Sequence, residues 1–165
     1  MAIEAPASKY RRTNLKIYIG VCILVAVIFG YDGYLSKYKW SKRYSFYQKH
    51  VIDNDGKPDS TMNFNRKSPP VFIGAAVLLG VYLLSIKKKK LIADENELIF
   101  SDKEKILCKS IQAINKTNFK SKGYFVITYK DQNGKETERK ISDKKYDNLE
   151  AVLDHLVAKI SEVPQ

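Results

Sequence analysis

Two long apolar runs, separated by a polar segment, stand out in the first half of the chain. The first extends from Leu15 to Leu35 and is free of charge between Ile17 and Tyr31; the second extends from Pro69 to Ile86 and ends at four lysines, Lys87–Lys90. A hydrocarbon core of about 30 Å is crossed by about 20 apolar residues, and lysines cluster at the cytoplasmic end of spanning helices. The pattern therefore predicts two transmembrane helices, 15–35 and 69–86, with 87–90 as a lysine stop.

Each predicted span has an alternative. For the first it is a cleaved signal peptide, because the basic stretch SKYRRTNLK precedes the run. No small-x-small cleavage site follows, so an uncleaved anchor is favoured. For the second it is a buried core helix, but the polar residues expected in such a helix are missing. Pro69 and Pro70 are expected in the first turn, where backbone N–H groups have no helical partner.

The segment between the spans, 36–68, begins with a basic and aromatic stretch. Trp40 and several tyrosines alternate with Lys37, Lys42 and Arg43, and some of the aromatic residues recur at roughly helical intervals. Two structures fit this pattern: a helix lying in the membrane interface, or a continuation of the first span beyond the bilayer. The following stretch, DNDGKPDSTMNFNRKSPP, has the composition of a turn-rich connection.

Beyond the lysines the pattern changes to that of a small β-rich domain. Two short strands are expected around the turn Asp94–Asn96, and another over SIQAINKTNF with Ile111 and Ala113 on one face. The clearest element is a hairpin in which Tyr124–Tyr129 meets Glu136–Ile141 through DQNG, because Asn-Gly is a strong hairpin signal.

The chain ends in an expected amphipathic helix. Six apolar residues have the spacing of one helix face: Leu149, Val152, Leu153, Leu156, Val157 and Ile160. Ser142 or Asp143 is the expected N-cap. The whole chain is therefore predicted to be α+β, with a transmembrane helix hairpin followed by an antiparallel domain over 91–162 that the C-terminal helix closes.

This order of elements resembles the pleckstrin-homology-like (PH-like) domains of bacterial membrane proteins. The stretches that carry the resemblance are ENELIFSDKEKILCKSIQAI, GYFVITYKDQNGKETERKI and YDNLEAVLDHLVAKI. The resemblance implies a β-barrel-like fold, of the usual seven strands or fewer, that binds proteins or lipids and seldom catalyses a reaction. The phosphoinositide site of that superfamily depends on a basic first hairpin, whereas the segment IADENEL here is acidic.

The excess positive charge flanks the apolar runs. The formal net charge is +11; residues 1–90 hold 16 Lys and Arg against 5 Asp and Glu, whereas residues 91–165 hold 13 of each. A nucleic-acid protein would carry its basic surplus on the folded domain, so lipid headgroups are the expected partners. The expected membrane-interface residues are Arg11, Arg12, Lys16, Lys37, Trp40, Lys42, Arg43, Lys87, Lys88, Lys89 and Lys90.

Charge counting also favours an orientation. With both termini inside, ten basic residues, Lys103 and Lys105 among them, lie on the cytoplasmic side against eight in the loop. The basic N-terminus, 1–14, and the domain are therefore expected in the cytoplasm, with the spans in a bacterial inner membrane. Each span also carries a small-x-x-x-small pair, Ala26 with Gly30 and Ala76 with Gly80, through which helices could pack.

Candidate chemistry is sparse. His50 and His155 have no second metal ligand nearby in the sequence, Cys22 and Cys108 are expected to stay unpaired, and no nucleotide-binding or nucleophile motif is present. We therefore expect a protein without enzymatic activity, cofactor or metal. Its expected function is that of a scaffold or accessory subunit that presents the PH-like module to a protein partner. The alternative is a sensor of anionic lipid that uses the basic aromatic loop.

Overall fold

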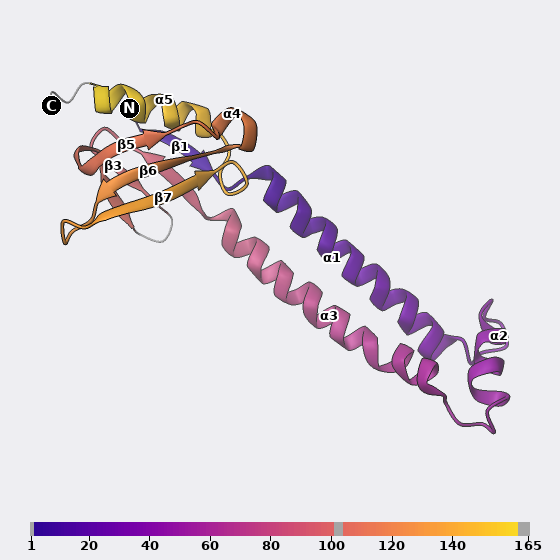
Figure 1. Ribbon diagram of the computed structural model, residues 1–165. Coiled ribbons are helices and arrows are strands. Elements are labelled where there is room, and N and C mark those ends of the chain that lie inside the picture. The colour runs from indigo at the N-terminus through magenta and orange to yellow at the C-terminus, as the bar shows by residue number, and fades with distance from the viewer. Residues whose placement is uncertain (1, 101–103, 162–165) are drawn as a thin grey trace. The chain divides into compact units, whose positions relative to one another are not determined.

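The computed structural model describes residues 2–100 and 104–161, so Lys103 and position 162 of the expected domain lie outside the described residues. The chain is α+β, as predicted, and divides into two compact units. One unit, residues 14–83, is helical, and the other, residues 1–13 and 84–165, contains every described strand. Figure 1 labels elements of both units where there is room.

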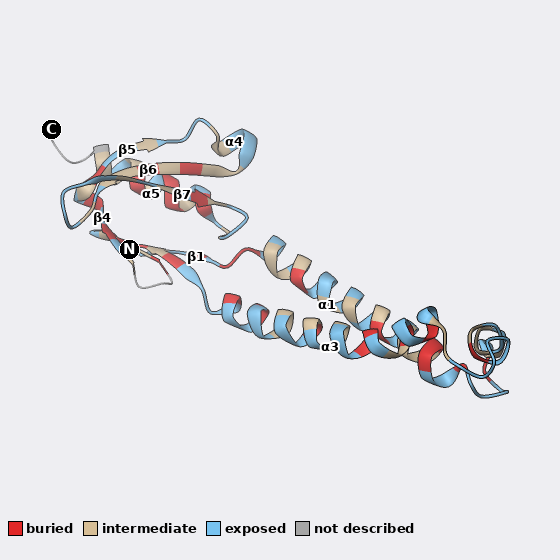
Figure 2. Cartoon of the chain, turned by 60° about the horizontal axis from the view of Figure 1, so that its bottom comes forward, coloured by how far each residue is buried: buried red, intermediate tan, exposed pale blue. Residues whose placement is uncertain are grey.

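Two long helices, α1 (Lys9–Gly30) and α3 (Ser60–Lys87), dominate the helical unit, where they run side by side (Figure 1). The first continues through a π-helical turn, η1 (Tyr31–Leu35). Both are long and apolar enough to cross a membrane, and their most apolar windows are only 11% and 17% buried. Figure 2 shows exposed positions along both helices. Val27, Val71 and Leu78 are among the exposed apolar residues. A soluble core helix would instead bury most of its apolar residues.

The second helix begins at Ser60 rather than at Pro69, which corrects two expectations. Pro69 and Pro70 lie inside α3 rather than in its first turn, and the end of the expected turn-rich connection is helical. A proline inside a helix leaves the carbonyl four residues earlier without its usual donor. The carbonyls concerned belong to Asn65 and Arg66. Gly33 and Tyr34, both in η1, lie against these two carbonyls at the place where the helix continues through the prolines.

The connection between α1 and α3 contains a short helical stretch, α2 (Tyr44–Tyr47) followed by η2 (Gln48–Ile52), and turns precede it. Helical structure therefore occurs both as a continuation of the first helix, as far as Leu35, and as a separate segment that begins at Tyr44.

The small residues of the predicted spans differ in their surroundings. Ala26 and Ala76 are buried within the helical unit. A Cβ atom added at Gly30 would meet Pro69 at 3.9 Å, whereas one at Gly80 would find nothing within 4 Å. Three of the four residues therefore have close neighbours in the hairpin, and Gly80 faces open space.

The N-terminal residues join the domain as a strand that the sequence pattern did not predict. β1 (Ile3–Pro6) pairs antiparallel with β2 (Lys90–Ala93), and β3 (Glu97–Ile99) and β4 (Lys105–Leu107) complete a four-stranded sheet in that order. The two strands around the turn Asp94–Asn96 are thus confirmed. Because β1 precedes α1 and β2 follows α3, the two long helices form an insertion between neighbouring strands. The acidic segment IADENEL forms the hairpin of β2 and β3.

A second antiparallel sheet contains β5 (Ile111–Asn115), β6 (Tyr124–Lys130) and β7 (Glu136–Ser142), with the short helix α4 (Phe119–Lys122) between β5 and β6. The predicted β6–β7 hairpin is confirmed. Its turn has three residues, because Asp131 N donates to Lys135 O at 2.9 Å and Gly134 N donates to Asp131 O at 3.0 Å. Gly134 has a φ of +74°. A type I turn followed by a left-handed glycine has this pattern.

The expected face of β5 is wrong. A bulge between Ile111 and Ala113 shifts the register, so that Ile111 is buried and Ile114 packs against the core, whereas Ala113 is exposed. A bulge adds one residue to a strand and thereby exchanges the faces of the residues beyond it.

The C-terminal helix, α5 (Leu149–Ser161), has the predicted apolar face. Its buried residues join one core with residues of both sheets, and the helix packs against β1 and β2. The expected N-cap, Ser142 or Asp143, is wrong. Ser142 ends β7, and Asp143 N donates to Gly123 O at 2.9 Å.

Pairing with the N-terminal segment explains the late start of α5. Asp147 N donates to Pro6 O at 2.8 Å, and Ser8 N donates to Lys145 O at 3.0 Å. The Asp147 carboxylate in turn accepts a hydrogen bond from Lys9 N, in the first turn of α1, at 3.0 Å. A side chain of the domain therefore caps the first long helix, because the first N–H groups of a helix lack partners within it.

Candidate functional site

The loop end of the helical unit holds five of the six buried polar side chains in the described residues: Asp32, Ser36, Ser41, Asn65 and Ser68. Burial of polar groups has a cost that only hydrogen bonds offset. Their concentration at one end of a hairpin that is otherwise apolar makes this end the candidate site.

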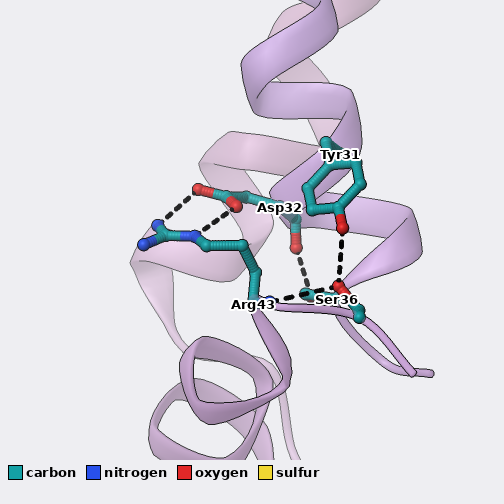
Figure 3. A network of polar contacts seen from close by, with 5 residues as sticks. Tyr31, Asp32, Ser36 and Arg43 are labelled. Atoms are coloured by element: carbon teal, nitrogen blue, oxygen red, sulfur yellow. Dashed lines mark hydrogen bonds and ion pairs between the residues drawn. The ribbon is translucent and has the colours of Figure 1, made fainter. Parts of the chain in front are cut away.

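An ion pair between Asp32 and Arg43 forms the centre of the site (Figure 3). The guanidinium donates through Nε to Oδ1 at 2.8 Å and through Nη2 to Oδ2 at 2.7 Å. The carboxylate side chain is 11% exposed and the guanidinium side chain 51%. The hydrogen bond to Asp32, together with the charge of that carboxylate, raises the pKa of Arg43. A bidentate pair of this kind fixes the orientation of both planar groups.

Two serines make hydrogen bonds beside this pair. Ser36 Oγ donates to the backbone carbonyl of Asp32, and the Ser41 hydroxyl lies 3.1 Å from Tyr31 Oη (Figure 3). Arg43 N donates to Ser41 Oγ at 3.2 Å. The turn after η1 is therefore held against the end of the first helix by side-chain bonds.

A close backbone approach joins the same end of α1 to α3. Gly33 is buried, and a Cβ atom there would lie 2.8 Å from Asn65 O. Tyr34 Oη donates to Arg66 O at 2.7 Å, and Arg66 Nε donates to Gly33 O at 3.0 Å. The phenol thus supplies a donor to the carbonyl that Pro70 cannot serve.

A second contact between side chains closes the loop at the start of α3. His50 Nδ1 lies 2.7 Å from Asp59 Oδ2, and Met62 N donates to Asp59 Oδ1 at 2.8 Å. Asp59 is thus the N-cap of α3. The hydrogen bond from His50, followed by that from Met62, lowers the pKa of Asp59. From the sequence, His50 was considered only as a metal ligand, and no local pattern indicated this contact with a residue nine positions later.

The predicted interface residues of the loop lie on its surface. Lys37, Trp40 and Lys42 are exposed, and the Trp40 ring stacks on Tyr38 at 5.6 Å. Of the expected loop residues, Arg43 is thus the one whose side chain makes an ion pair. The loop end combines a buried polar centre with a surface of aromatic and basic side chains.

The remaining predicted interface residues lie near the other ends of the helices. Arg11, Arg12 and Lys16 are on the first turns of α1, and Lys16 is exposed. Lys87 ends α3, and the lysine run then enters the sheet. The ammonium of Lys90, the first residue of β2, lies 2.6 Å from the Glu4 carboxylate on β1.

An open groove with a volume of about 840 Å³ lies in the domain beside β4 and the β6–β7 turn. Its wall includes the exposed Leu107. Glu104 pairs there with Arg139, whose guanidinium lies 3.7 Å from the Phe100 ring centroid. In residues 2–100 and 104–161, no three acidic, histidine or cysteine side chains gather in a way that could hold a metal ion.

No protein-family model, curated protein or solved structure matches the chain. Its function is therefore inferred from the geometry described above.

Proposed function

We propose that the chain is a two-pass membrane protein that holds a PH-like interaction module at the cytoplasmic face of a bacterial inner membrane. The module would act as a scaffold or accessory subunit for a protein partner. One observation carries the proposal: the apolar helix hairpin is inserted between the paired strands β1 and β2. This pairing supports a hairpin whose two outer ends lie on the same side of a bilayer.

The same pairing favours an uncleaved anchor over a signal peptide. Ala5 on β1 is completely buried in the core of the domain, so removal of the N-terminal segment would open that core. The lysine run Lys87–Lys90 beside the second helix favours the cytoplasm as the side of the domain.

The PH-like assignment is supported by the number and order of the strands. Seven strands in the described residues form a four-stranded and a three-stranded antiparallel sheet, and a C-terminal helix packs into their common core. A chain in which α1 and α3 occupy one connection between strands can still build this arrangement, because β1 supplies the strand that the C-terminal part lacks.

Labelling of single cysteines tests the orientation. Cys108 is a poor reporter, because it is buried and burial raises the pKa of its thiol. Exposed positions serve better, for example Ser45→Cys in the loop and Ser121→Cys in the domain, each in a chain with both native cysteines replaced by alanine. A membrane-impermeant maleimide should label position 45 in intact cells and position 121 only after permeabilisation. The reverse pattern would overturn the proposed orientation.

Deletion of residues 91–165 tests the function of the module. The truncated chain should remain in the membrane after an alkaline wash, because both apolar helices are retained. A soluble partner that cross-links to the full chain in cells should be lost. Recovery of that partner in equal amounts from the truncated chain would contradict the proposal, and release of the full chain by the alkaline wash would contradict the membrane anchor itself.

A further inference from the structure

A shallow groove of about 340 Å³ lies at the loop end of α1 and combines two chemistries. Val27 and Ile28 form an apolar wall, and these residues are 61% and 50% exposed. Tyr31, Asp32 and Arg43 form the polar rim. An apolar wall that ends at a guanidinium matches the two parts of a phospholipid, its acyl chain and its phosphate.

Arg43 is held in place with part of its donor set unused. Its Nε and Nη2 donate to Asp32, and its guanidinium carbon lies 5.0 Å from the Phe46 ring centroid. Nη1 makes no hydrogen bond to the described residues. A guanidinium whose orientation is already fixed loses little conformational entropy when it binds an anion, and its planar fork suits phosphate oxygens.

The position of Arg43 along the hairpin suits a headgroup. Lys16 and Asp32 bound the apolar part of the first helix and lie about 24 Å apart along its axis, at a rise of about 1.5 Å per residue. Snorkelling of the long basic side chains extends this span towards the hydrocarbon thickness of about 30 Å. Because Asp32 binds Arg43 directly, the guanidinium lies at the same level as the end of the apolar run.

The charge balance of the loop selects an anionic lipid. Residues 33–52 contain five basic residues and no acidic residue. Asp32 neutralises one of these charges, so residues 32–52 retain a surplus of four basic residues. A zwitterionic headgroup gains little from this surplus, whereas a headgroup with a net negative charge is attracted by every nearby cation.

We propose that the loop end of the hairpin binds an anionic phospholipid, with its phosphate on Arg43 and an acyl chain along Val27 and Ile28. Asp32 is a positioning residue that orients the guanidinium. This inference rests on the proposed function in one respect, since it requires that the helices span a bilayer. The proposed site also supplies specific binding residues for the alternative function, a sensor of anionic lipid that uses the basic aromatic loop.

Lipid retention by the purified full chain tests the site. Native mass spectrometry of the protein in detergent would measure the affinity for phosphatidylglycerol, for phosphatidylcholine and for free glycerol phosphate. Arg43→Gln should weaken phosphatidylglycerol binding about tenfold, the worth of one strong charge-assisted hydrogen bond. Lys57→Gln is the matched control, because this exposed lysine does not line the groove, and it should change the affinity less than twofold.

A second variant separates binding from folding. Arg43→Gln alone leaves the Asp32 carboxylate without its cation, whereas the double change Asp32→Asn with Arg43→Gln replaces the ion pair by two amides. The double variant should fold, with unchanged Trp40 fluorescence, and should still bind phosphatidylglycerol about tenfold more weakly.

Three results would overturn the inference. The first is wild-type lipid affinity in both Arg43 variants. The second is phosphatidylcholine binding as tight as that of phosphatidylglycerol. The third is binding of free glycerol phosphate as tight as that of the lipid, which would identify a soluble phosphate ligand. A chain that does not float with vesicles would refute the membrane anchor, whereas a floating chain with an unchanged Arg43→Gln affinity refutes the lipid site alone.

Discussion

The close approach of Gly33 to α3 leads to a sharp prediction about the hairpin. Replacing Gly33 with alanine would place a Cβ atom 2.8 Å from Asn65 O, 2.9 Å from Asn65 C and 3.0 Å from Arg66 N. All three neighbours are backbone atoms of a helix, so no side chain can rotate away to make room. The two helices must therefore separate locally, by about 0.5 Å if an ordinary carbon–oxygen contact of about 3.3 Å is to be restored.

Two opposing effects set the magnitude. Overpacking of one methyl group against a rigid neighbour costs about 1–3 kcal/mol, and separation also strains the hydrogen bonds Tyr34 Oη to Arg66 O and Arg66 Nε to Gly33 O. Alanine in place of glycine within a helix gains at most about 1 kcal/mol. Gly33→Ala should therefore lower the free energy of unfolding by about 1–2 kcal/mol, a factor of about 5 to 30 in the equilibrium constant.

Gly74→Ala is the matched control, because a Cβ atom at Gly74 meets nothing within 4 Å. It keeps the propensity gain without the clash and should be neutral or slightly stabilising. Titration of the full chain in mild detergent with sodium dodecyl sulfate measures both variants, and Trp40, the one tryptophan of the sequence, reports on the loop end by its fluorescence. Equal midpoints for the two variants would show that the helices do not approach closely at Gly33.

Two further predictions concern the domain and the loop. Because Ala7 N donates to Lys89 O at 3.0 Å, beyond the last β1–β2 pair, replacing residues 9–87 with Asn-Gly should yield a soluble domain with a cooperative thermal transition. An insoluble or unfolded product would mean that the domain depends on the helices. At the loop end, the hydrogen bond from His50 lowers the pKa of Asp59. The ionised carboxylate therefore contributes its full stabilisation above the carboxyl pKa of the unfolded chain, about 4. This stabilisation is lost as the pH falls through the lowered pKa of Asp59 in the folded chain. Trp40 fluorescence of the wild type should change below about pH 4, and that of Asp59→Asn should not; the same acid transition in both proteins would contradict this assignment.

Elements with strong local periodicity were predictable. The two apolar helices, the β6–β7 hairpin and the apolar face of α5 all follow from spacing within a single stretch of the chain. Predictions failed where a distant residue decided the outcome. The bulge in β5 exposes Ala113, and the start of α5 depends on pairing of Asp147 with Pro6.

The candidate site was predictable only in composition. Its exposed members, Lys37, Trp40 and Lys42, were evident as a basic aromatic stretch. The pairing of Asp32 with Arg43 was not, because a carboxylate at the end of an apolar run looks like an ordinary loop residue. Gly33 likewise has no local signal, since its closeness to α3 is a property of two helices and not of either one.

Local sequence pattern was sufficient to predict two helices of membrane-spanning length, a small antiparallel domain and an amphipathic C-terminal helix. Such elements can be predicted because side-chain periodicity along a short segment reflects which of its faces is apolar. The three-dimensional fold was needed to show that Ile3–Pro6 completes the domain and that the helix hairpin interrupts it. Strand pairing across more than 80 residues depends on backbone hydrogen bonds and on burial of Ala5, and neither leaves a periodic trace in the four residues of β1.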